Sequence, residues 1–234
     1  MFARISARYD LVNRLLSLGI DRRWRAAMLR VAGAVRGRVA VDLCCGTGDV
    51  ALLLARHGAT VVGVDFTREM IDLAERKRVH RRATRCAPVL FTHGDATRVP
   101  LRKGSVDLAT IAFGIRNIDD RSAVLREIAR VLRPGGILVV LEFGRPPGRR
   151  LASAYELYFH SVLPRVGAFV SGDGEAYAYL PRSVATWPGP MDFQAEIESA
   201  GFTACGHRPL SGGIAYLHWG RSLGGSARLG SEPD

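Results

Sequence analysis

The feature that most constrains this chain is a short apolar segment that leads directly into a glycine-rich turn. Val39–Leu43 has the length and composition of a buried strand, and Cys45-Gly46-Thr47-Gly48 follows it. We predict a helix from Asp49 to His57, directly after the turn. Because glycine has no Cβ, the turn lets a ligand approach the backbone closely, and the start of the helix presents free N–H groups to an anion. The segment therefore predicts a strand–turn–helix unit whose ligand carries an anionic group.

The same alternation of strands and helices continues along the chain and predicts an α/β fold. Further strands are predicted at Thr60–Val64, Val89–Thr92, Asp107–Phe113 and Ile137–Phe143, and helices at Arg68–Val79 and Arg121–Leu132. A helix near Met191–Ala200 precedes two last strands, near Thr203–His207 and Ile214–Trp219, and the turn Ser211-Gly212-Gly213 suits an antiparallel hairpin. The expected fold is Rossmann-like, with a seven-stranded, mostly parallel sheet that ends in an antiparallel hairpin.

The predicted elements form one domain, over residues 1–221. Residues 1–37 are expected to form N-terminal helices, because their apolar residues recur at helical spacing in two stretches that Gly19 and Gly37 punctuate. We expect these helices to act as a lid. Residues 145–190 interrupt the alternation and are rich in Tyr, Phe and Pro, so we expect a helical insertion there that covers the substrate. The Gly- and Ser-rich tail, residues 222–234, is predicted to be disordered.

The charge balance of the chain is basic but not localised. There are 33 Lys and Arg against 22 Asp and Glu, a formal net charge of +11, and only Lys77 and Lys103 are lysines. Such a charge would suit nucleic acid or an anionic membrane surface. The basic residues are scattered over many elements, however, and no basic aromatic face or added binding module is evident. We therefore expect no nucleic-acid partner.

The sequence shows no pattern typical of a membrane span, a signal peptide, a zinc site or a disulfide framework. No apolar run approaches the ~18 residues of a membrane span, and the N-terminus does not have the pattern of a signal peptide. The four cysteines, Cys44, Cys45, Cys86 and Cys205, match no zinc pattern and no disulfide framework. We expect reduced cysteines, no metal and a cytoplasmic protein.

A carboxylate at the end of the second strand is a candidate ribose ligand. Asp65 stands 19 positions after Gly46, where its oxygens could accept hydrogen bonds from two ribose hydroxyls. The alternative is that Asp65 caps the next helix, although Thr67 is the better placed cap.

The glycine turn alone does not choose between two nucleotide-like ligands. Gly46-x-Gly48-x-x-Ala51 also satisfies the dinucleotide fingerprint. S-adenosylmethionine (AdoMet) is favoured because Asp42 lies inside the first strand, where a dehydrogenase usually has an apolar residue, and because Gly94-Asp95-Ala96 follows the third strand, where a carboxylate can bind an adenine amino group. Neither lysine has a tyrosine four residues before it, as a short-chain dehydrogenase would require.

These features resemble a class I AdoMet-dependent methyltransferase and, within that class, the ubiquinone/menaquinone biosynthesis C-methyltransferase family. The matching segments run from residue 2 to about 220: Tyr9–Ser17 with Trp24-Arg25, Phe113–Asn117, Arg130–Gly136, Leu141–Phe143, Tyr158–Pro164, Tyr177–Ser183 and Gly212–His218. Val12, Asp21 and Gly144 stand where the family usually has Met, His and Ser. The resemblance implies methylation of a ring carbon of a prenylated quinol, either a demethylmenaquinol or a methoxy-polyprenyl-benzoquinol.

Ring methylation requires a nucleophilic carbon, which a deprotonated neighbouring hydroxyl provides. A phenol has a pKa of ~10, so the site must stabilise the phenolate or supply a base. Arg116 is our candidate for holding that oxygen, Asn117 for orienting a water or the ring oxygen, and His160 is the alternative base. Both Arg116 and Asn117 could instead only cap the turn after the fourth strand. The cofactor is assigned to Asp42, Gly46, Thr47, Gly48, Asp65, Asp95, Ala96 and Ala112.

The expected partners follow from the acceptor. A prenyl tail resides in a membrane, so the enzyme should touch the bilayer peripherally, and aromatic residues of the insertion (Tyr155, Tyr158, Phe159, Phe169, Tyr177 and Tyr179) suit a flat ring. A homodimer is left open, as is the choice between the two quinols. The alternatives are a methyltransferase that acts on nucleic acid or another small molecule and, less favoured, an oxidoreductase.

Overall fold

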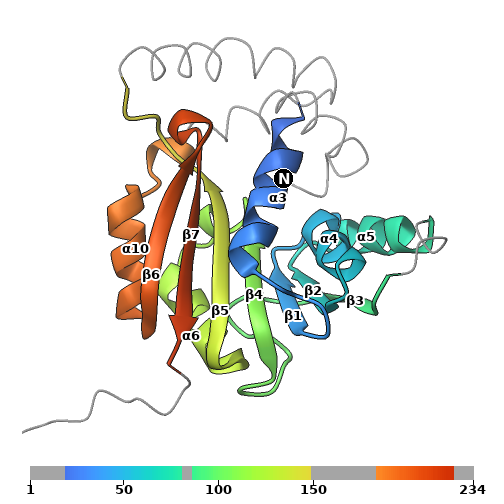
Figure 1. Cartoon of the computed structure of the whole chain (residues 1–234). Coiled ribbons are helices and arrows are strands. Elements are labelled where there is room, and N and C mark those ends of the chain that lie inside the picture. The colour runs from blue at the N-terminus through green and yellow to red at the C-terminus, as the bar shows by residue number, and fades with distance from the viewer. Residues whose placement is uncertain (1–18, 81–85, 149–182, 224–234) are drawn as a thin grey trace, which may run out of the picture.

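A computed structural model describes residues 19–80, 86–148 and 183–223, and a seven-stranded sheet forms the centre of this part (Figure 1). The strand order is β3-β2-β1-β4-β5-β7-β6. The strands are β1 (Val39–Leu43), β2 (Thr60–Asp65), β3 (Val89–His93), β4 (Val106–Ala112), β5 (Leu132–Phe143), β6 (Phe202–Leu210) and β7 (Ala215–Ser222).

Strands β1 to β5 are parallel, whereas β7 runs antiparallel to both β5 and β6. The central strands are apolar on both faces because parallel sheets are covered on both sides. The 3-10 turn η4 (Ser211–Gly213) joins β6 to β7, and Gly212 and Gly213 adopt φ values of 69° and 96° there. The predicted mostly parallel sheet with a C-terminal hairpin is confirmed.

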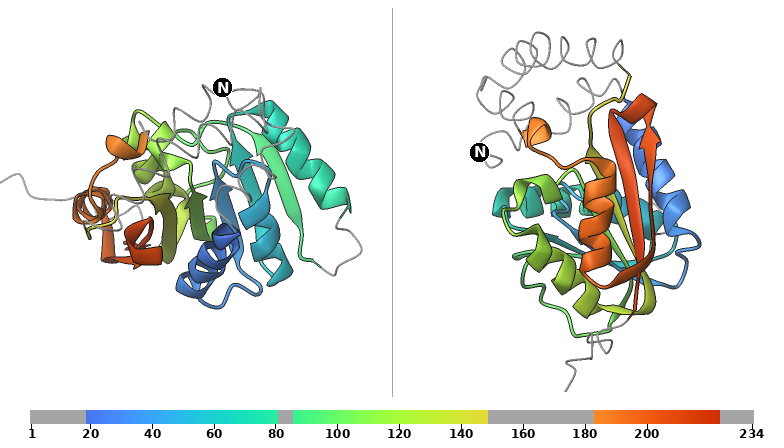
Figure 2. Two further views of the ribbon diagram at one scale, coloured as in Figure 1. Left: turned by 90° about the horizontal axis from the view of Figure 1, so that it is seen from above. Right: turned by 90° about the vertical axis from the view of Figure 1, so that its left-hand side faces the viewer.

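Helices cover the two faces of the sheet, as Figure 2 shows from two directions. On one face lie α3 (Ile20–Ala32), α4 (Asp49–Arg56) and α5 (Arg68–His80), and on the other lie α6 (Arg121–Val131) and α10 (Pro190–Ser199). Each face has its own apolar core. Trp24 and Met28 of α3 belong to the first core, and Ile128 of α6 and Phe193 of α10 belong to the second.

The elements predicted within the described residues are present, with small shifts at their ends and one larger correction. We predicted a fifth strand from Ile137, but β5 begins at Leu132, directly after α6. Val106 of β4 pairs with Leu132, and Leu108 pairs with Ile137, so the Pro134-Gly135-Gly136 turn is an irregularity inside β5. The turn stops the helix, as expected, but the strand pairs on both sides of it.

Some predictions concern residues that the structure does not describe. These include the first part of the predicted lid, His160, the aromatic residues of the insertion and residues 224–234. Ser222, placed in the predicted tail, belongs to β7. Within the described residues, no helix combines the length and apolar character needed to cross a membrane.

Candidate active site

A cavity of about 450 Å³ opens where the strands β1 to β4 end. Its lining comes from the residues that follow these strands: Cys44 and Gly46 after β1, Phe66 after β2, Gly94 after β3 and Phe113 after β4. The strand order reverses at this point, because β2 and β3 follow on one side of β1 and β4 and β5 on the other. Open α/β sheets bind ligands at such a switch point, outside the carboxyl ends of the strands.

The cavity brings together six of the ten residues that the sequence suggested for the site. These six are Gly46, Asp65, Asp95, Ala96, Ala112 and Asn117. The other four, Asp42, Thr47, Gly48 and Arg116, are not part of its lining. Their contacts show what each does instead.

Asp65 is fixed by backbone amides from two sides. Its Oδ2 accepts the Gly46 N–H (2.8 Å), and its Oδ1 accepts the Thr67 N–H (2.9 Å). Burial raises the pKa of Asp65, although these bonds oppose the shift. The Thr67 side chain also donates to Asp65. A carboxylate has about four acceptor positions, so these three hydrogen bonds leave room for a ligand hydroxyl. The capping alternative and the ribose role are therefore compatible.

Asp95 is more exposed than Asp65, and local hydrogen bonds hold the backbone around it. Its Oδ1 accepts the Thr97 N–H (2.8 Å), and the adjacent Ala96 is buried. The ring nitrogen Nε2 of His93, at the end of β3, lies 2.8 Å from the carbonyl oxygen of Phe66. This contact joins the ends of β2 and β3. Phe66 stands at the cavity with 75% of its surface exposed.

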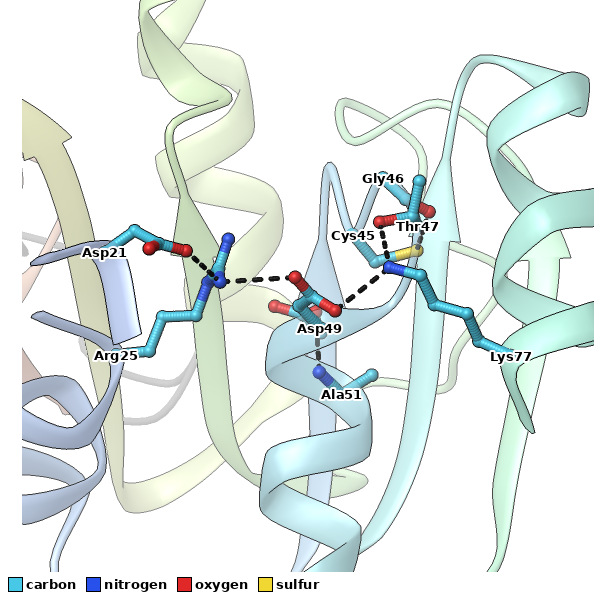
Figure 3. A network of polar contacts seen from close by, with 9 residues as sticks. Asp21, Arg25, Cys45, Gly46, Thr47, Asp49, Ala51 and Lys77 are labelled. Atoms are coloured by element: carbon cyan, nitrogen blue, oxygen red, sulfur yellow. Dashed lines mark hydrogen bonds and ion pairs between the residues drawn. The ribbon is translucent and has the colours of Figure 1, made fainter. Parts of the chain in front are cut away.

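The glycine turn packs closely against the interior of the protein. Gly48 has φ 80°, and a Cβ there would lie 2.5 Å from the Phe91 ring, so this position admits only glycine. Thr47 is 4% exposed, and its hydroxyl accepts a hydrogen bond from Lys77 Nζ (2.6 Å; Figure 3). The Thr47 side chain is therefore occupied inside the protein.

Asp42 lies beneath the turn, buried inside β1. Its Oδ1 accepts the Thr110 hydroxyl (2.7 Å), and its Oδ2 accepts the Ala51 N–H (3.1 Å) in the first turn of α4. Burial raises its pKa to about 7. These contacts tie β1, β4 and α4 together, so Asp42 supports the turn from below.

Arg116 lies in a buried ion pair. Asn117 and Arg116 share the short 3-10 helix η2 (Ile115–Asn117), but only Asn117 lines the cavity. The Arg116 side chain is 7% exposed, and its Nη1 donates to Glu142 Oε1 (2.6 Å), which is fully buried. Burial raises the pKa of Glu142, and the Arg116 guanidinium opposes that shift.

Three further contacts fix the Arg116 guanidinium. Nη1 also donates to the Phe113 carbonyl (2.8 Å), Nε donates to Ser183 Oγ (3.3 Å), and the group lies over the Phe143 ring, 5.3 Å from its centroid. Ser183 lies at the start of the chain that follows residues 149–182. Sequence reasoning assigned no role to Glu142 or Ser183, because neither has a partner nearby in the sequence.

Strained backbone surrounds the cavity. Cys44 (φ 51°) and Phe113 (φ 57°), both in the lining, adopt left-handed conformations although neither is glycine. A Cβ on Gly114 would lie 2.3 Å from the Cβ of Cys44, so these two turns pack tightly against each other. Such strain concentrates at functional sites. The sequence analysis predicted only that Cys44 is reduced and did not place it in the site, so it missed this residue of the lining.

The described residues form neither a disulfide nor a cluster of metal ligands. All four cysteines are described, and none forms a disulfide. Burial raises the pKa of the Cys44 and Cys45 thiols, which keeps them protonated and unreactive. The residues that the structure describes contain no group of three or more side chains able to hold a metal ion.

The residues present fit AdoMet. The cavity has the volume of a small-molecule site, and the carboxylates Asp65 and Asp95 line it together with Gly46 of the glycine turn. Together with the sheet order, these features define a class I AdoMet-dependent methyltransferase.

The family follows from comparison with known proteins. Residues 1–222 match the model of the ubiE/COQ5 methyltransferase family, and the chain belongs to this family. It is 46% identical over 229 residues to the ubiquinone/menaquinone biosynthesis C-methyltransferase UbiE of Syntrophotalea carbinolica, covering 96% of this chain and 94% of that one. It is 44% identical over 222 residues to the demethylmenaquinone methyltransferase of Thermus thermophilus, covering 94% and 99%.

A solved structure agrees at the level of the fold. A SAM-dependent methyltransferase from Aquifex aeolicus superposes with a TM-score of 0.61 at 17% identity, covering 85% of this chain and 89% of that one. The class I fold predicted from the sequence is therefore confirmed, and so is the family resemblance.

Proposed function

We propose that this protein transfers the methyl group of AdoMet to a ring carbon of a prenylated quinol, with demethylmenaquinol as the first candidate. The observation that carries the proposal is the family match over residues 1–222, together with relatives of 44% and 46% identity that are named for this reaction. A methoxy-polyprenyl-benzoquinol is the second candidate, because the name of one of these relatives also includes ubiquinone.

The cofactor assignment made from the sequence divides into two groups of residues. Gly46, Asp65, Asp95, Ala96 and Ala112 line the cavity, and we propose that they contact AdoMet directly. Asp65 would accept hydrogen bonds from the ribose, and Asp95 from the adenine. Asp42, Thr47 and Gly48 would act by shaping the turn, because their side chains or Cβ positions face the interior.

The reaction needs an anionic ring oxygen. Bound AdoMet supplies an electrophilic methyl group on a sulfonium. The acceptor hydroxyl loses its proton, the ring carbon forms the new C–C bond as the C–S bond breaks, and the ring C–H proton leaves to restore the aromatic quinol. The protein must therefore stabilise the phenolate as its charge develops, and preorganised donors do this best.

Arg116 remains our candidate for that role, and its contacts limit how it can act. Nη1 and Nε are engaged, whereas Nη2 has no hydrogen-bond partner among the residues that the structure describes. The ring oxygen would bind at Nη2. Asn117, which lines the cavity, would orient that oxygen or a water.

The direct test is an assay with purified protein, labelled AdoMet and each of the two reduced quinols, followed by mass spectrometry of the product. We expect one methyl group on the demethylmenaquinol ring and none on the oxidised quinone, which has no ionisable hydroxyl. A protein that binds AdoMet but methylates neither quinol would overturn the proposal. Transfer to a short duplex or another small molecule would favour the alternative acceptors.

The test of Arg116 must take account of its buried partner. Arg116→Gln alone leaves the Glu142 carboxylate without a countercharge, so the matched variant is Arg116→Gln with Glu142→Gln, which removes both charges and keeps much of the volume. We expect kcat to fall by about 10²–10³, as for the loss of one oxyanion donor, with AdoMet affinity nearly unchanged. Raising the pH should restore part of the rate. A folded double variant with near-normal kcat would make Arg116 structural, and His160 would be tested next.

We further propose a cytoplasmic protein that docks on the membrane surface. The prenyl tail of the acceptor and the net charge of +11 support this. Binding to vesicles with anionic lipid should weaken as salt rises, and equal binding to neutral vesicles would exclude an electrostatic contribution. Light scattering of the same preparation decides whether the protein is a homodimer.

A further inference from the structure

The proposed site combines residues that follow different strands of the sheet. Most of the proposed cofactor residues stand at the ends of β1 to β3, among them Gly46, Asp65 and Asp95, whereas the acceptor residues Arg116 and Asn117 follow β4 in η2. Because β1 and β4 are neighbours in the sheet (Figure 1), the two groups meet where these strands end. The spacing across this boundary matters for methyl transfer, since a misplacement of about 1 Å can cost on the order of 10²-fold in rate.

Cys44 and Gly114 lie against each other at this boundary. Cys44 is the first residue after β1 and Gly114 the second after β4, and both line the cavity. A Cβ added to Gly114 would overlap the Cβ of Cys44 and lie 3.0 Å from its Sγ. The next atom, Cγ2 of Ile111, is 3.7 Å away, which is an ordinary contact. Cys44 alone therefore occupies the space that a side chain at position 114 would need.

Space, and not backbone conformation, requires glycine at position 114. Gly114 has φ −118° and ψ −37°, values that other residues also adopt. Cys44, in contrast, has φ 51°, in the left-handed region that favours glycine. The contact has room for one Cβ, and the chain places that Cβ on the residue whose backbone accommodates it less easily.

Gly114 is joined to both acceptor residues. It precedes η2, and its carbonyl accepts the Asn117 N–H (3.0 Å). The residue before it, Phe113, donates its N–H to the Leu141 carbonyl (2.8 Å), and its own carbonyl accepts Nη1 of Arg116 (2.8 Å). A displacement of Gly114 would therefore move Asn117 and disturb the Arg116 guanidinium.

Cys44 is joined to the cofactor side of the boundary. The next residue, Cys45, donates its N–H to the Val64 carbonyl of β2 (3.1 Å). One residue further, the Gly46 N–H donates to Asp65 Oδ2 (2.8 Å). These bonds hold the turn after β1 to the end of β2, so Cys44 keeps its place relative to the cofactor residues.

We infer that Gly114 is a positioning residue that sets the spacing between the cofactor and the acceptor. Its missing Cβ lets the turn after β4 approach the turn after β1, and this approach brings Asn117 into the lining of the same cavity as Gly46. A side chain at position 114 would push the two turns apart while leaving the hydrogen bonds of each turn in place. The inference rests on the proposed methyl transfer and adds to it the residue that joins its two halves.

Gly114→Ala adds a single methyl group at the boundary. Assays with saturating AdoMet and demethylmenaquinol measure kcat, and calorimetry measures the Kd of AdoMet. We expect kcat to fall by about 10²-fold, the effect of a displacement of about 1 Å. The Kd of AdoMet should stay nearly constant, because the bonds on the cofactor side remain.

A compensating variant tests whether the contact with Cys44 is the cause. Gly114→Ala combined with Cys44→Gly moves the Cβ from one side of the contact to the other, so the added methyl group has room. Glycine also suits the left-handed backbone at position 44. We expect the double variant to recover most of the wild-type kcat.

Gly206→Ala is the matched control for a general loss of stability. Gly206 lies on β6, the edge strand at the other end of the sheet from β3, and a Cβ there would lie 2.5 Å from the Trp219 ring. This variant should lower the melting temperature, as Gly114→Ala does, but it should leave kcat unchanged.

Each contrary outcome overturns a defined claim. Near-normal kcat in Gly114→Ala, no recovery in the double variant, or an equal loss of kcat in Gly206→Ala would each overturn the inference while the wild type remains active. If Gly114→Ala does not fold, the double variant decides, and a double variant that is unfolded or has low kcat is evidence against the inference. A wild type that methylates neither quinol would overturn the proposed function and this inference with it.

Discussion

Carboxylates at the same edge of the sheet have opposite surroundings in two regions of the molecule. Asp65, at the end of β2, is held by backbone N–H groups and lines a cavity. Glu142, near the end of β5, is fully buried and pairs with a guanidinium at 2.6 Å. Amide partners orient a carboxylate but leave its charge for a ligand, whereas a guanidinium cancels that charge. The Asp65 carboxylate therefore keeps its charge for a ligand, whereas the Glu142 carboxylate holds Arg116 in place.

The largest effect should come from breaking the buried pair. Glu142→Ala leaves Arg116 charged and unpaired inside the protein, and we expect it to reduce the free energy of unfolding by about 3–5 kcal/mol. Urea unfolding measures this loss. Asp65→Ala is the matched control from the cavity region and should cost much less stability. If the two variants lose equal stability, the contrast between the regions is wrong.

For AdoMet binding we expect the opposite order, with a larger effect from Asp65 than from Glu142. Asp65→Ala should weaken AdoMet binding by roughly 1.5–3 kcal/mol, the range for hydrogen bonds to a charged group. Calorimetry on the folded variant measures it, with Asp72→Ala, an exposed carboxylate on α5, as the control. Unchanged affinity would leave Asp65 as a residue that only orders the turn.

His218 lies in the same half of the sheet as the buried pair and should make the protein less stable in acid. His218 of β7 is buried against Phe193, its Nδ1 has no partner among the described residues, and burial lowers its pKa to about 3. His207 lies beside it, with ring centroids 5.8 Å apart, and contributes to the lowering.

The unfolded chain binds a proton at His218 near its ordinary pKa of ~6.5, whereas the folded protein binds it only near pH 3. The stability that the neutral ring provides is therefore full above pH 7 and declines as the pH falls from 6.5 toward 3. Between pH 7.5 and pH 5 we expect His218 to contribute a loss of about 2 kcal/mol. Burial also raises the pKa of Asp42 to about 7, which acts in the opposite direction over this range, so urea titrations at both pH values compare the wild type with His218→Phe. We expect the wild type to be more sensitive to acid than the variant by about this amount. A variant with the same pH dependence as the wild type would show that His218 makes no such contribution.

The smallest effect should be at Asp95. This residue is exposed, so water competes for its oxygens, and Asp95→Ala should weaken AdoMet binding by only about 0.5–1.5 kcal/mol. The same calorimetry measures it. A variant that binds AdoMet normally but melts at a lower temperature would show that Asp95 orders its turn through Thr97 and nothing more.

Much of this protein follows from local sequence. The strand–glycine turn–helix at residues 39–57, the repeated alternation and the Ser211-Gly212-Gly213 turn determine the parallel sheet and its hairpin, because periodicity and glycine conformations act over a few residues. The positions of Asp65 and Asp95 at strand ends were enough to place them beside one cavity, since the carboxyl ends of parallel strands share an edge.

Tertiary structure decided which charges meet. Arg116 and Glu142 are 26 residues apart, and Lys77 reaches Thr47 across 30 residues, so their pairing depends on how η2 packs on β5 and α5 on α4. The sequence placed Thr47 and Arg116 in the site, but packing directed the Thr47 hydroxyl inward and gave Arg116 a buried partner. A charged side chain takes its partner from the neighbours that folding brings within about 4 Å, and no local pattern records that distance.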